Sequence, residues 1–515
     1  MRRSKSNQES QLVLGWQVTA AGELEYWRNS KVKPGAPEQE EYLYKVPAHT
    51  MGAHTAIIAQ SGSGKSFFLG RLIEELMLRT QCNCLILDPN ADFRQISTIK
   101  HESLWKNARY DPGSRTGKLP HESCRKDFQK YWDKIAIRVR VSRGYLRSNE
   151  NYDPLTFWWP RLSVEFLNED LEPRLHSDLY HCHALVQSLE MLYTYTNRKI
   201  REPRDLLTEA QQLFRFKSKE ELRAYLKEQF LTRSERAKSK RSRFDFFTEL
   251  RLRRVRGAME SVVTATRYAS SEVERFYFGK AYQYDASGIL DYTIRPGVSP
   301  LLEKTKRLQV IDLPSLPDKA TRLLVINALL ATVWEKARAA WNEALRHSEE
   351  KDVRVPTFVV VDEAHNLMPA EPHSRAETAL RDQFRTIIAE GRKYGLFLIL
   401  VSQRPDKLDP LIVSECENKA IMKLASESVL ELTQKMLGLE DVSKRLLSNV
   451  LDYQTGSILL LGRWAPRGPQ TIYCAARRTK EGGGNLREKY WATPAAKKAA
   501  ITKRRPGARK RKSSR

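Results

Sequence analysis

The chain has 515 residues, of which 41% are hydrophobic and 29% charged, and this composition predicts a folded protein of about two to four domains rather than a disordered chain. Its 88 Lys and Arg residues outnumber 62 Asp and Glu residues, and the formal net charge of +26 favours a polyanionic partner such as nucleic acid. No apolar run approaches the length of a membrane-spanning helix, and none follows the basic start of the chain, so we expect a cytoplasmic protein without a membrane anchor.

Residues 1–49 predict a short β extension. Strand-like pieces occur at 11–18, 24–27 and 42–46, and a turn-rich segment with Lys, Pro and Gly separates the last two. We expect this extension to pack on a core whose first part covers residues 50–104.

A phosphate-binding loop follows the apolar strand predicted at 55–58. Residues 59–66 read AQSGSGKS, which is the G-x-x-x-x-G-K-[ST] pattern with alanine at its first position, and helical periodicity begins at residue 67. Strand, glycine turn and helix together aim backbone N–H groups and a helix N-terminus at one anion. We therefore predict ATP binding, with Lys65 at the β- and γ-phosphates and Ser66 on Mg²⁺. The predicted nucleotide-binding residues are Ala59, Gln60, Ser61, Gly62, Ser63, Gly64, Lys65, Ser66 and Phe67.

Residues 105–295 contain no nucleotide motif, and we interpret them as a mostly helical basic insertion. An alternating segment at 135–141 predicts a half-exposed strand, and long helices are predicted at about 169–196, 204–230 and 245–277. Residues 233–256 hold ten Lys and Arg residues, three acids and interleaved phenylalanines. Two readings stay open for this run: phosphate contact with stacking, or a solvated helix face whose aromatic rings point into a bundle.

The second part of the core covers residues 296–480, with a strand at 308–313, a helix at about 318–347 and a buried strand at 358–361. Two carboxylates at the end of a buried strand need a cation beside them. We predict that Asp362 holds Mg²⁺ and that Glu363 is the general base that activates the attacking water.

A further apolar strand at 396–401 leads into Gln403, which we expect to orient that water and to sense the γ-phosphate. Just before this strand, Arg392 is a candidate arginine finger that would act on the site of a neighbouring subunit. Arg385 and Arg404 are its rivals, and a solvated surface arginine is the alternative.

The end of the chain predicts two closing strands at 420–424 and 457–461 and then a flexible basic tail at 481–515. Three glycines at 482–484 form a joint, and the last twenty residues contain ten Lys and Arg residues and no acids. Such a tail cannot bury a core and is expected to order only on a polyanion, unless it serves solvation alone.

Four segments together resemble the HerA-like branch of the HerA/FtsK superfamily of DNA-pumping ATPases. The resemblance covers residues 50–100 and 300–480, and two departures from the family stand out. Only about fifty residues precede the phosphate loop, where the family usually has a β-barrel, and Asp92 stands where the family more often has glutamate. The segments are AQSGSGKS (59–66), LILDPNADF (85–93), VVVDEAHNLMP (359–369) and EGRKYGLFLILVSQRPDKLDP (390–410).

This resemblance implies an α/β fold, with a RecA-like P-loop NTPase core and a mainly parallel sheet. It also implies a homo-oligomer, a hexameric ring whose sites are shared between neighbours, with double-stranded DNA as partner and a separate nuclease to do any cutting. The favoured function is an ATP-hydrolysing ring motor that translocates along or remodels DNA, in DNA processing or phage defence. The alternatives are an ATP-dependent scaffold or switch in a defence or regulatory complex, and a conjugation- or secretion-type DNA pump.

Overall fold

The computed structural model describes a large part of the chain, and every structural statement below concerns that part. The described residues are 10–18, 43–101, 125–141, 153–154, 184–185, 187–189, 191–196, 213, 215–216, 218–231, 246–268, 307–316, 318–346, 352 and 354–482.

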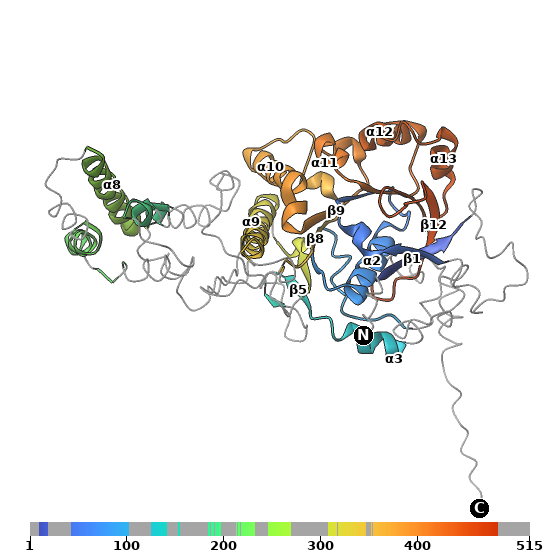
Figure 1. Cartoon of the computed structure of the whole chain (residues 1–515), viewed down its shortest axis with the longest axis horizontal. Coiled ribbons are helices and arrows are strands. Elements are labelled where there is room, and N and C mark those ends of the chain that lie inside the picture. The colour runs from blue at the N-terminus through green and yellow to red at the C-terminus, as the bar shows by residue number, and fades with distance from the viewer. Residues whose placement is uncertain are drawn as a thin grey trace, which may run out of the picture.

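A twelve-stranded sheet forms the centre of the described residues (Figure 1). Eight neighbouring strands, which begin with β10 and end with β6 in spatial order, run parallel to one another. Four antiparallel strands extend the sheet beyond β10. In spatial order the strands are β2 (Leu43–Pro47), β1 (Gln11–Gln17), β12 (Gln470–Cys474), β11 (Ser457–Leu461), β10 (Asn418–Ile421), β3 (Thr55–Ile58), β9 (Leu396–Ser402), β8 (Thr357–Val361), β4 (Asn83–Asp88), β7 (Leu308–Asp312), β5 (Ile137–Val141) and β6 (Asp153–Pro154).

Both faces of the parallel part are buried, because helices cover both. Alternate residues of one strand enter two different cores: Leu398 and Leu400 of β9 face one, Ile399 and Val401 the other. The first core includes α9 and α10, and Figure 1 shows α10 to α13 gathered over that face. The second includes α2 and α3. The helices are α2 (Lys65–Arg79), α3 (Arg125–Trp132), α6 (Lys219–Leu226), α8 (Phe246–Tyr268), α9 (Lys319–Ala344), α10 (Arg375–Glu390), α11 (Pro410–Ser414), α12 (Glu427–Leu437) and α13 (Lys444–Ser448).

This α/β sheet, mainly parallel and with helices on both faces, is the fold that the sequence predicts. The strand at 55–58 has the predicted bounds, while β8 begins one residue early and β10 lies two to three residues before its predicted place. The N-terminal strands expected at 11–18 and 42–46 are present as β1 and β2. They join the sheet itself through the β1–β12 pairing. The strand expected at 24–27 lies outside the described residues.

One predicted boundary requires correction. The sequence places the segment at 135–141 in the mostly helical insertion, but β5 pairs in parallel with β7, so the core sheet includes this strand beyond residue 104. Its alternating pattern arises because the strand lies near a sheet edge. Inside it, Arg140 is 1% exposed and its Nε donates to Oε1 of Gln309 at 3.1 Å, which accounts for a charged residue within the sheet.

In the rest of the predicted insertion, α8 falls within the helix expected at 245–277, and α6 packs against it through an exposed ion pair between Arg223 and Glu260. Residues 233–245, which begin the basic run, and the tail after 482 lie outside the described residues. Among the helices that the structure does describe, none has the length and apolar character needed to cross a membrane.

Candidate ATPase site

The predicted phosphate loop connects β3 to α2 at the carboxyl edge of the parallel strands. Gly62 and Gly64 have φ angles of 77° and 95°, in the left-handed region that favours glycine. Gly64 is the N-cap of α2, and its carbonyl accepts the first helical hydrogen bond from the N–H of Phe68 at 3.0 Å. The unpaired N–H groups of the first turn of α2 are therefore available at the loop, as an anion site requires.

Lys65 brings the two predicted motifs together. Its Nζ lies 2.9 Å from Oδ1 of Asp362 and also pairs with Oε1 of Glu363, although the residues are 297 and 298 positions apart. All three side chains are buried, with relative exposures of 7%, 0% and 6%. Burial opposes the ammonium charge, but the two carboxylates raise the pKa of Lys65 above its usual value. Burial also disfavours the charged form of Asp362 and raises its pKa, while the Lys65 ammonium acts to lower it.

Glu363 adopts an unusual backbone conformation for a residue with a side chain. Its φ and ψ angles are 47° and 48°, which places it in the left-handed region at the start of a short 3-10 helix, η10 (Ala364–Asn366). Gln403, which follows β9, donates from Nε2 to Oε1 of Glu363. The structure thus brings Glu363 and Gln403 together, as the sequence predicts for a base and a water-orienting amide. The left-handed backbone of Glu363 is a local strain of the kind that is often found at functional sites.

His365 is a neighbour that the sequence analysis did not assign. Its Nδ1 lies 3.1 Å from Oγ of Ser402 and 3.5 Å from Oε2 of Glu363. Burial lowers the pKa of His365, so the neutral ring is favoured at neutral pH. The imidazole therefore limits the positions that the Glu363 side chain can take without adding a second full charge beside it.

The oxygen atoms at this edge fit Mg²⁺, a cation that prefers oxygen ligands in near-octahedral geometry. Oγ of Ser66 donates to Oδ2 of Asp92 at 2.6 Å, so the hydroxyl is beside a carboxylate. Oδ2 of Asp362 is buried and has no hydrogen-bond partner among the described residues. A buried, unpaired carboxylate oxygen is costly unless it meets a cation. Ser66 and Asp362 are the residues that would hold the metal, and Asp92 lies next to them.

Asp88, at the end of β4, shapes the loop that carries Asp92. Its carboxylate accepts backbone N–H groups from Asn90, Asp92 and Phe93 at 3.3, 3.1 and 2.8 Å. Burial raises the pKa of Asp88 to about 7. The sequence did carry a signal for this turn, since an aspartate followed by Pro-Asn after an apolar strand favours such side-chain-to-backbone bonds.

Arg392 lies at the amino ends of the parallel strands, whereas Gln403 lies at their carboxyl ends. Arg392 belongs to the short helix η11 (Gly391–Tyr394) before β9, whereas Gln403 follows that seven-residue strand, so about 20 Å separates the two within one chain. The Arg392 side chain is 58% exposed and its Nη1 lies 2.7 Å from Oε1 of Glu417. The structure therefore does not place Arg392 at its own chain's phosphate loop.

The two rival arginines have different surroundings. Arg385 binds Oδ2 of the buried Asp409 at 2.7 Å, an anchor that would have to break before it could reach another molecule. Arg404 is adjacent to Gln403, on the carboxyl edge, and pairs with Asp406 at 3.3 Å. Arg385 is thus the most firmly fixed of the candidates and Arg404 is the one nearest to its own chain's site.

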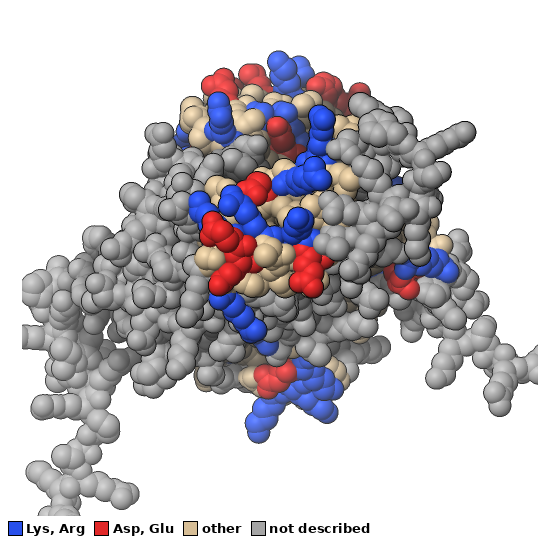
Figure 2. Space-filling model, turned by 90° about the vertical axis from the view of Figure 1, so that its left-hand side faces the viewer, with Lys and Arg blue, Asp and Glu red and all other residues tan. Residues whose placement is uncertain are grey.

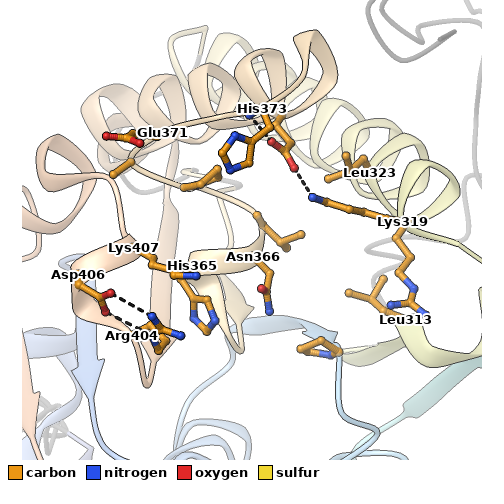
Figure 3. A pocket seen from close by; sticks show the side chains of 16 residues that line it. Leu313, Lys319, Leu323, His365, Asn366, Glu371, His373, Arg404, Asp406 and Lys407 are labelled. Carbon is orange, nitrogen blue, oxygen red and sulfur yellow. Dashed lines mark hydrogen bonds and ion pairs between the residues drawn. The ribbon is translucent and has the colours of Figure 1, made fainter. Parts of the chain in front are cut away.

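A cavity of about 820 Å³ lies beside the site, and Figure 3 shows His365 and Asn366 at it together with Lys319 of α9. Two cations of its lining, Lys319 and Arg404, pair with Glu377 and Asp406, respectively. Since these two cations already have acidic partners, neither of them marks the cavity as an anion site.

Comparison with known families agrees with this geometry. The profile described as "Helicase HerA, central domain" matches residues 41–333, and that described as "ATPase family associated with various cellular activities (AAA)" matches residues 312–424. The protein titled "DNA double-strand break repair helicase HerA" from Sulfolobus acidocaldarius is 29% identical over 180 residues, 34% of this chain and 33% of the relative. The protein of that title from Pyrococcus furiosus is 28% identical over 180 residues, 31% of each chain. The aligned part thus spans about a third of these curated relatives.

Two solved structures are also similar to this chain. VirB4 of Thermoanaerobacter pseudethanolicus has a TM-score of 0.35 at 16% identity, covering 82% of this chain and 88% of that one. The plasmid coupling protein TrwB in complex with ADP and Mg²⁺ has a TM-score of 0.39 at 12% identity, covering 92% and 96%. The family assignment rests on the profile match, which extends over more than half of the chain: the protein belongs to the HerA helicase central-domain family of P-loop ATPases.

Proposed function

We propose that the protein hydrolyses ATP with Mg²⁺ and uses the energy to translocate along or remodel double-stranded DNA, acting as a homo-oligomeric, hexameric ring in the cytoplasm. The observation that carries the proposal is the contact of the buried Lys65, Asp362 and Glu363 with one another and with the partly buried Gln403, at the carboxyl ends of the parallel strands. These four side chains come from three adjacent strands and their following segments, which is the arrangement needed to act on one phosphate group.

In the proposed mechanism, Lys65 and the backbone N–H groups of residues 62–66 bind the phosphates, and Ser66 and Asp362 hold Mg²⁺. Bound Mg²⁺ would neutralise the charge that develops on the β- and γ-phosphate oxygens. Glu363 takes a proton from the attacking water at one carboxylate oxygen, while the Gln403 amide orients that water. Any cleavage of DNA is left to a partner nuclease.

The contacts of Lys65 lead us to propose an order of events at the site. Lys65 forms ion pairs with both Asp362 and Glu363. While Oε1 of Glu363 accepts a hydrogen bond from the Lys65 ammonium, that oxygen is occupied and does not face an attacking water. When Lys65 turns to the phosphates of a bound triphosphate, Glu363 is released from this pairing and can accept the proton. Nucleotide binding would then activate the base.

The proposed DNA partner is supported by charge and by the relatives from Sulfolobus acidocaldarius and Pyrococcus furiosus, each of which is named a DNA double-strand break repair helicase. Figure 2 shows Lys and Arg mixed with Asp and Glu over one face of the described residues. Positive charge therefore does not cover that face uniformly, although the whole chain has a formal net charge of +26. The basic runs at 233–256 and 496–515 are the segments that we propose for phosphate contact.

Duplex DNA provides the direct test. We expect it to stimulate ATP turnover and to bind with an affinity that falls steeply with salt, since each phosphate contact contributes about −0.9 to the slope of log K against log salt. Changing the ten Lys and Arg residues of 496–515 to Gln should make that slope shallower. The ATP turnover that the chain shows in the absence of DNA should persist in this variant. Deleting the same twenty residues is the matched comparison for chain length. Slow turnover that DNA does not change would contradict a motor and favour the ATP-dependent scaffold or switch.

A further inference from the structure

The segment after β12 runs back along the phosphate-loop helix. Its backbone pairs with the chain after Asp92: the N–H of Lys100 donates to the carbonyl of Arg478 at 2.9 Å, and that of Lys480 to the carbonyl of Thr98 at 2.8 Å. The buried Glu74 of α2 also accepts the N–H groups of residues 478 and 479. This segment, 475–482, is therefore fixed both against α2, which carries Ser66, and against the chain that follows Asp92.

Arg477 is the fully buried residue at the centre of this segment, with 0% of its surface exposed. Its Nη1 donates to the backbone carbonyl of Ser66 at 3.0 Å, and its Nη2 lies 3.4 Å from the carbonyl of Asp92. Further contacts fix the guanidinium: Nε donates to Oγ1 of Thr479 at 3.1 Å, and Nη2 to the carbonyl of Lys480 at 3.0 Å. One planar cation thus contacts the backbones of the two residues whose side chains meet at 2.6 Å.

Two neighbours show that this position is closely fitted. The guanidinium carbon lies 4.9 Å from the ring centroid of Phe93, directly after Asp92. On the helix, a Cβ placed on Gly70 would lie 2.3 Å from Cδ of Arg477 and 2.4 Å from its Nε. Real Cβ atoms do not approach other atoms so closely, so the glycine leaves the space that the arginine side chain occupies. The short side chain at residue 70 and the long one at residue 477 fit each other.

We propose that Arg477 is a positioning residue for the Mg²⁺ side of the nucleotide site, and that it acts by fixing Ser66 and Asp92 in register with each other. The guanidinium has a rigid fork of donors and serves two carbonyl acceptors in fixed directions, which a lysine ammonium on its flexible stem does not reproduce. Asp92 accepts the hydrogen bond of the Ser66 hydroxyl and so orients it. Because Mg²⁺ needs near-ideal octahedral geometry, a small shift of Asp92 relative to Ser66 would turn that hydroxyl away and weaken metal binding. This inference rests on the proposed use of Mg²⁺ with ATP.

The test separates metal-dependent from metal-independent nucleotide binding. ADP affinity is measured by calorimetry with Mg²⁺ and with EDTA, for the parent chain and for Arg477→Lys. We expect the gain in affinity that Mg²⁺ provides to fall about tenfold in the variant, because the loss of a residue that orients ligands typically lowers metal affinity 10–100-fold. Affinity in EDTA should stay within about twofold, since the phosphate contacts of the loop do not include Arg477.

Arg71→Lys is the matched control. Arg71 is also buried, at 1% exposure, and its Nη1 donates to the carbonyl of Ala476 at 3.5 Å, so it contacts the same segment. Its other contacts are with Glu75 and the backbone carbonyl of Val13 rather than with Ser66 or Asp92. We expect this control to lower the melting temperature as Arg477→Lys does while leaving the Mg²⁺-dependent gain unchanged. An equal loss of that gain in both variants would show a general effect of helix destabilisation and would overturn the inference.

Gly70→Ala gives a second, independent variant, because alanine favours helices but would displace Arg477. It should reproduce the reduced Mg²⁺-dependent gain of Arg477→Lys while the chain remains folded. An unchanged gain in folded Gly70→Ala and Arg477→Lys chains would overturn the positioning role and leave the proposed function intact. If the parent chain itself showed no Mg²⁺-dependent nucleotide binding, the proposed function would fail, which is a different outcome from failure of the inference.

Discussion

Charged side chains have opposite surroundings at the two ends of the parallel strands, here called the carboxyl edge and the amino edge. At the carboxyl edge, Lys65, Asp362 and Glu363 are buried against one another, and one oxygen of Asp362 has no partner among the described residues. At the amino edge, Arg392 is 58% exposed and is paired, within the part of the chain that the structure describes, with the half-exposed Glu417. Buried charge of the first kind is stabilised only by a cation or a ligand, while an exposed pair contributes about 0.2–1 kcal/mol and is easily exchanged. The carboxyl edge is therefore the one that we propose for the nucleotide, and the amino edge is the one that we propose for contact with a neighbouring chain.

The amino edge also has aromatic support for its cations. The Arg354 guanidinium lies 4.7 Å from the ring centroid of Trp341, and Nζ of Lys393 lies 5.2 Å from the same ring. Trp334 packs edge-on against Tyr394, in the same short helix as Arg392. These contacts hold η11 in place without burying the Arg392 side chain. The comparison teaches that a rigid sheet can present a catalytic cluster and an exposed arginine about 20 Å apart in one chain.

The largest effect should come from the base at the carboxyl edge. Glu363→Gln keeps the shape of the side chain but removes its ability to accept a proton, so we expect turnover to fall about 10²–10⁴-fold while ATP affinity changes little. Steady-state ATPase assays and nucleotide binding, measured side by side, provide the check. Unchanged turnover would remove Glu363 from the proposed mechanism.

Removing the cation of the same cluster should have a smaller effect, and on a different quantity. Lys65→Ala should weaken triphosphate binding about 10–100-fold, the cost of one charge-assisted contact. Lys393→Ala at the amino edge is the control, and there we expect the ATP affinity of the parent chain. Equal affinities for the Lys65 variant and the parent, by calorimetry, would mean that residues 59–66 do not bind the phosphates.

The smallest effect concerns pH and the buried histidine near the amino edge. Nδ1 of His54 accepts the N–H of Leu398 at 3.0 Å, and burial lowers the pKa of His54 to about 4. Because the unfolded chain binds this proton below about pH 6.5, His54 contributes stability at neutral pH that is lost as pH falls from about 6.5 towards 4. Between pH 6.5 and pH 5 the loss should be about 1–2 kcal/mol.

His54→Asn keeps an acceptor but does not titrate, so this variant tests the pH effect. Thermal unfolding of the parent and variant chains should differ most at pH 7 and converge on acidification. A constant difference between the two melting temperatures from pH 7 to pH 5 would show that His54 does not remain neutral in the folded chain.

The sequence predicted the parts of the site that depend on local patterns. The glycine turn before Lys65 and the acidic pair after a β-branched strand each lie within a few residues, and parallel strands bring their carboxyl ends to one edge. It did not predict Arg477, whose contact with Ser66 joins positions 411 residues apart and follows from packing alone. The alternation at β5 was likewise ambiguous, because an edge strand of the core and a strand of a separate domain have the same pattern.

The central claim is that the carboxyl edge of one chain and Arg392 of its neighbour form one site. Glu363→Gln and Arg392→Ala chains, each expected to be nearly inactive alone and to bind ATP, are mixed and their co-assembly is verified. In equal mixtures about a quarter of the interfaces combine an intact glutamate with an intact arginine, because ring contacts are heterologous. Dilution of the parent chain with Glu363→Gln shows how far partly intact rings still turn over.

We predict that the mixture recovers ATP hydrolysis to the level that this dilution sets for a quarter of intact sites. Absence of recovery in co-assembled rings, under conditions in which the dilution series retains activity, would contradict a shared site. Full activity of Arg392→Ala alone would also contradict it.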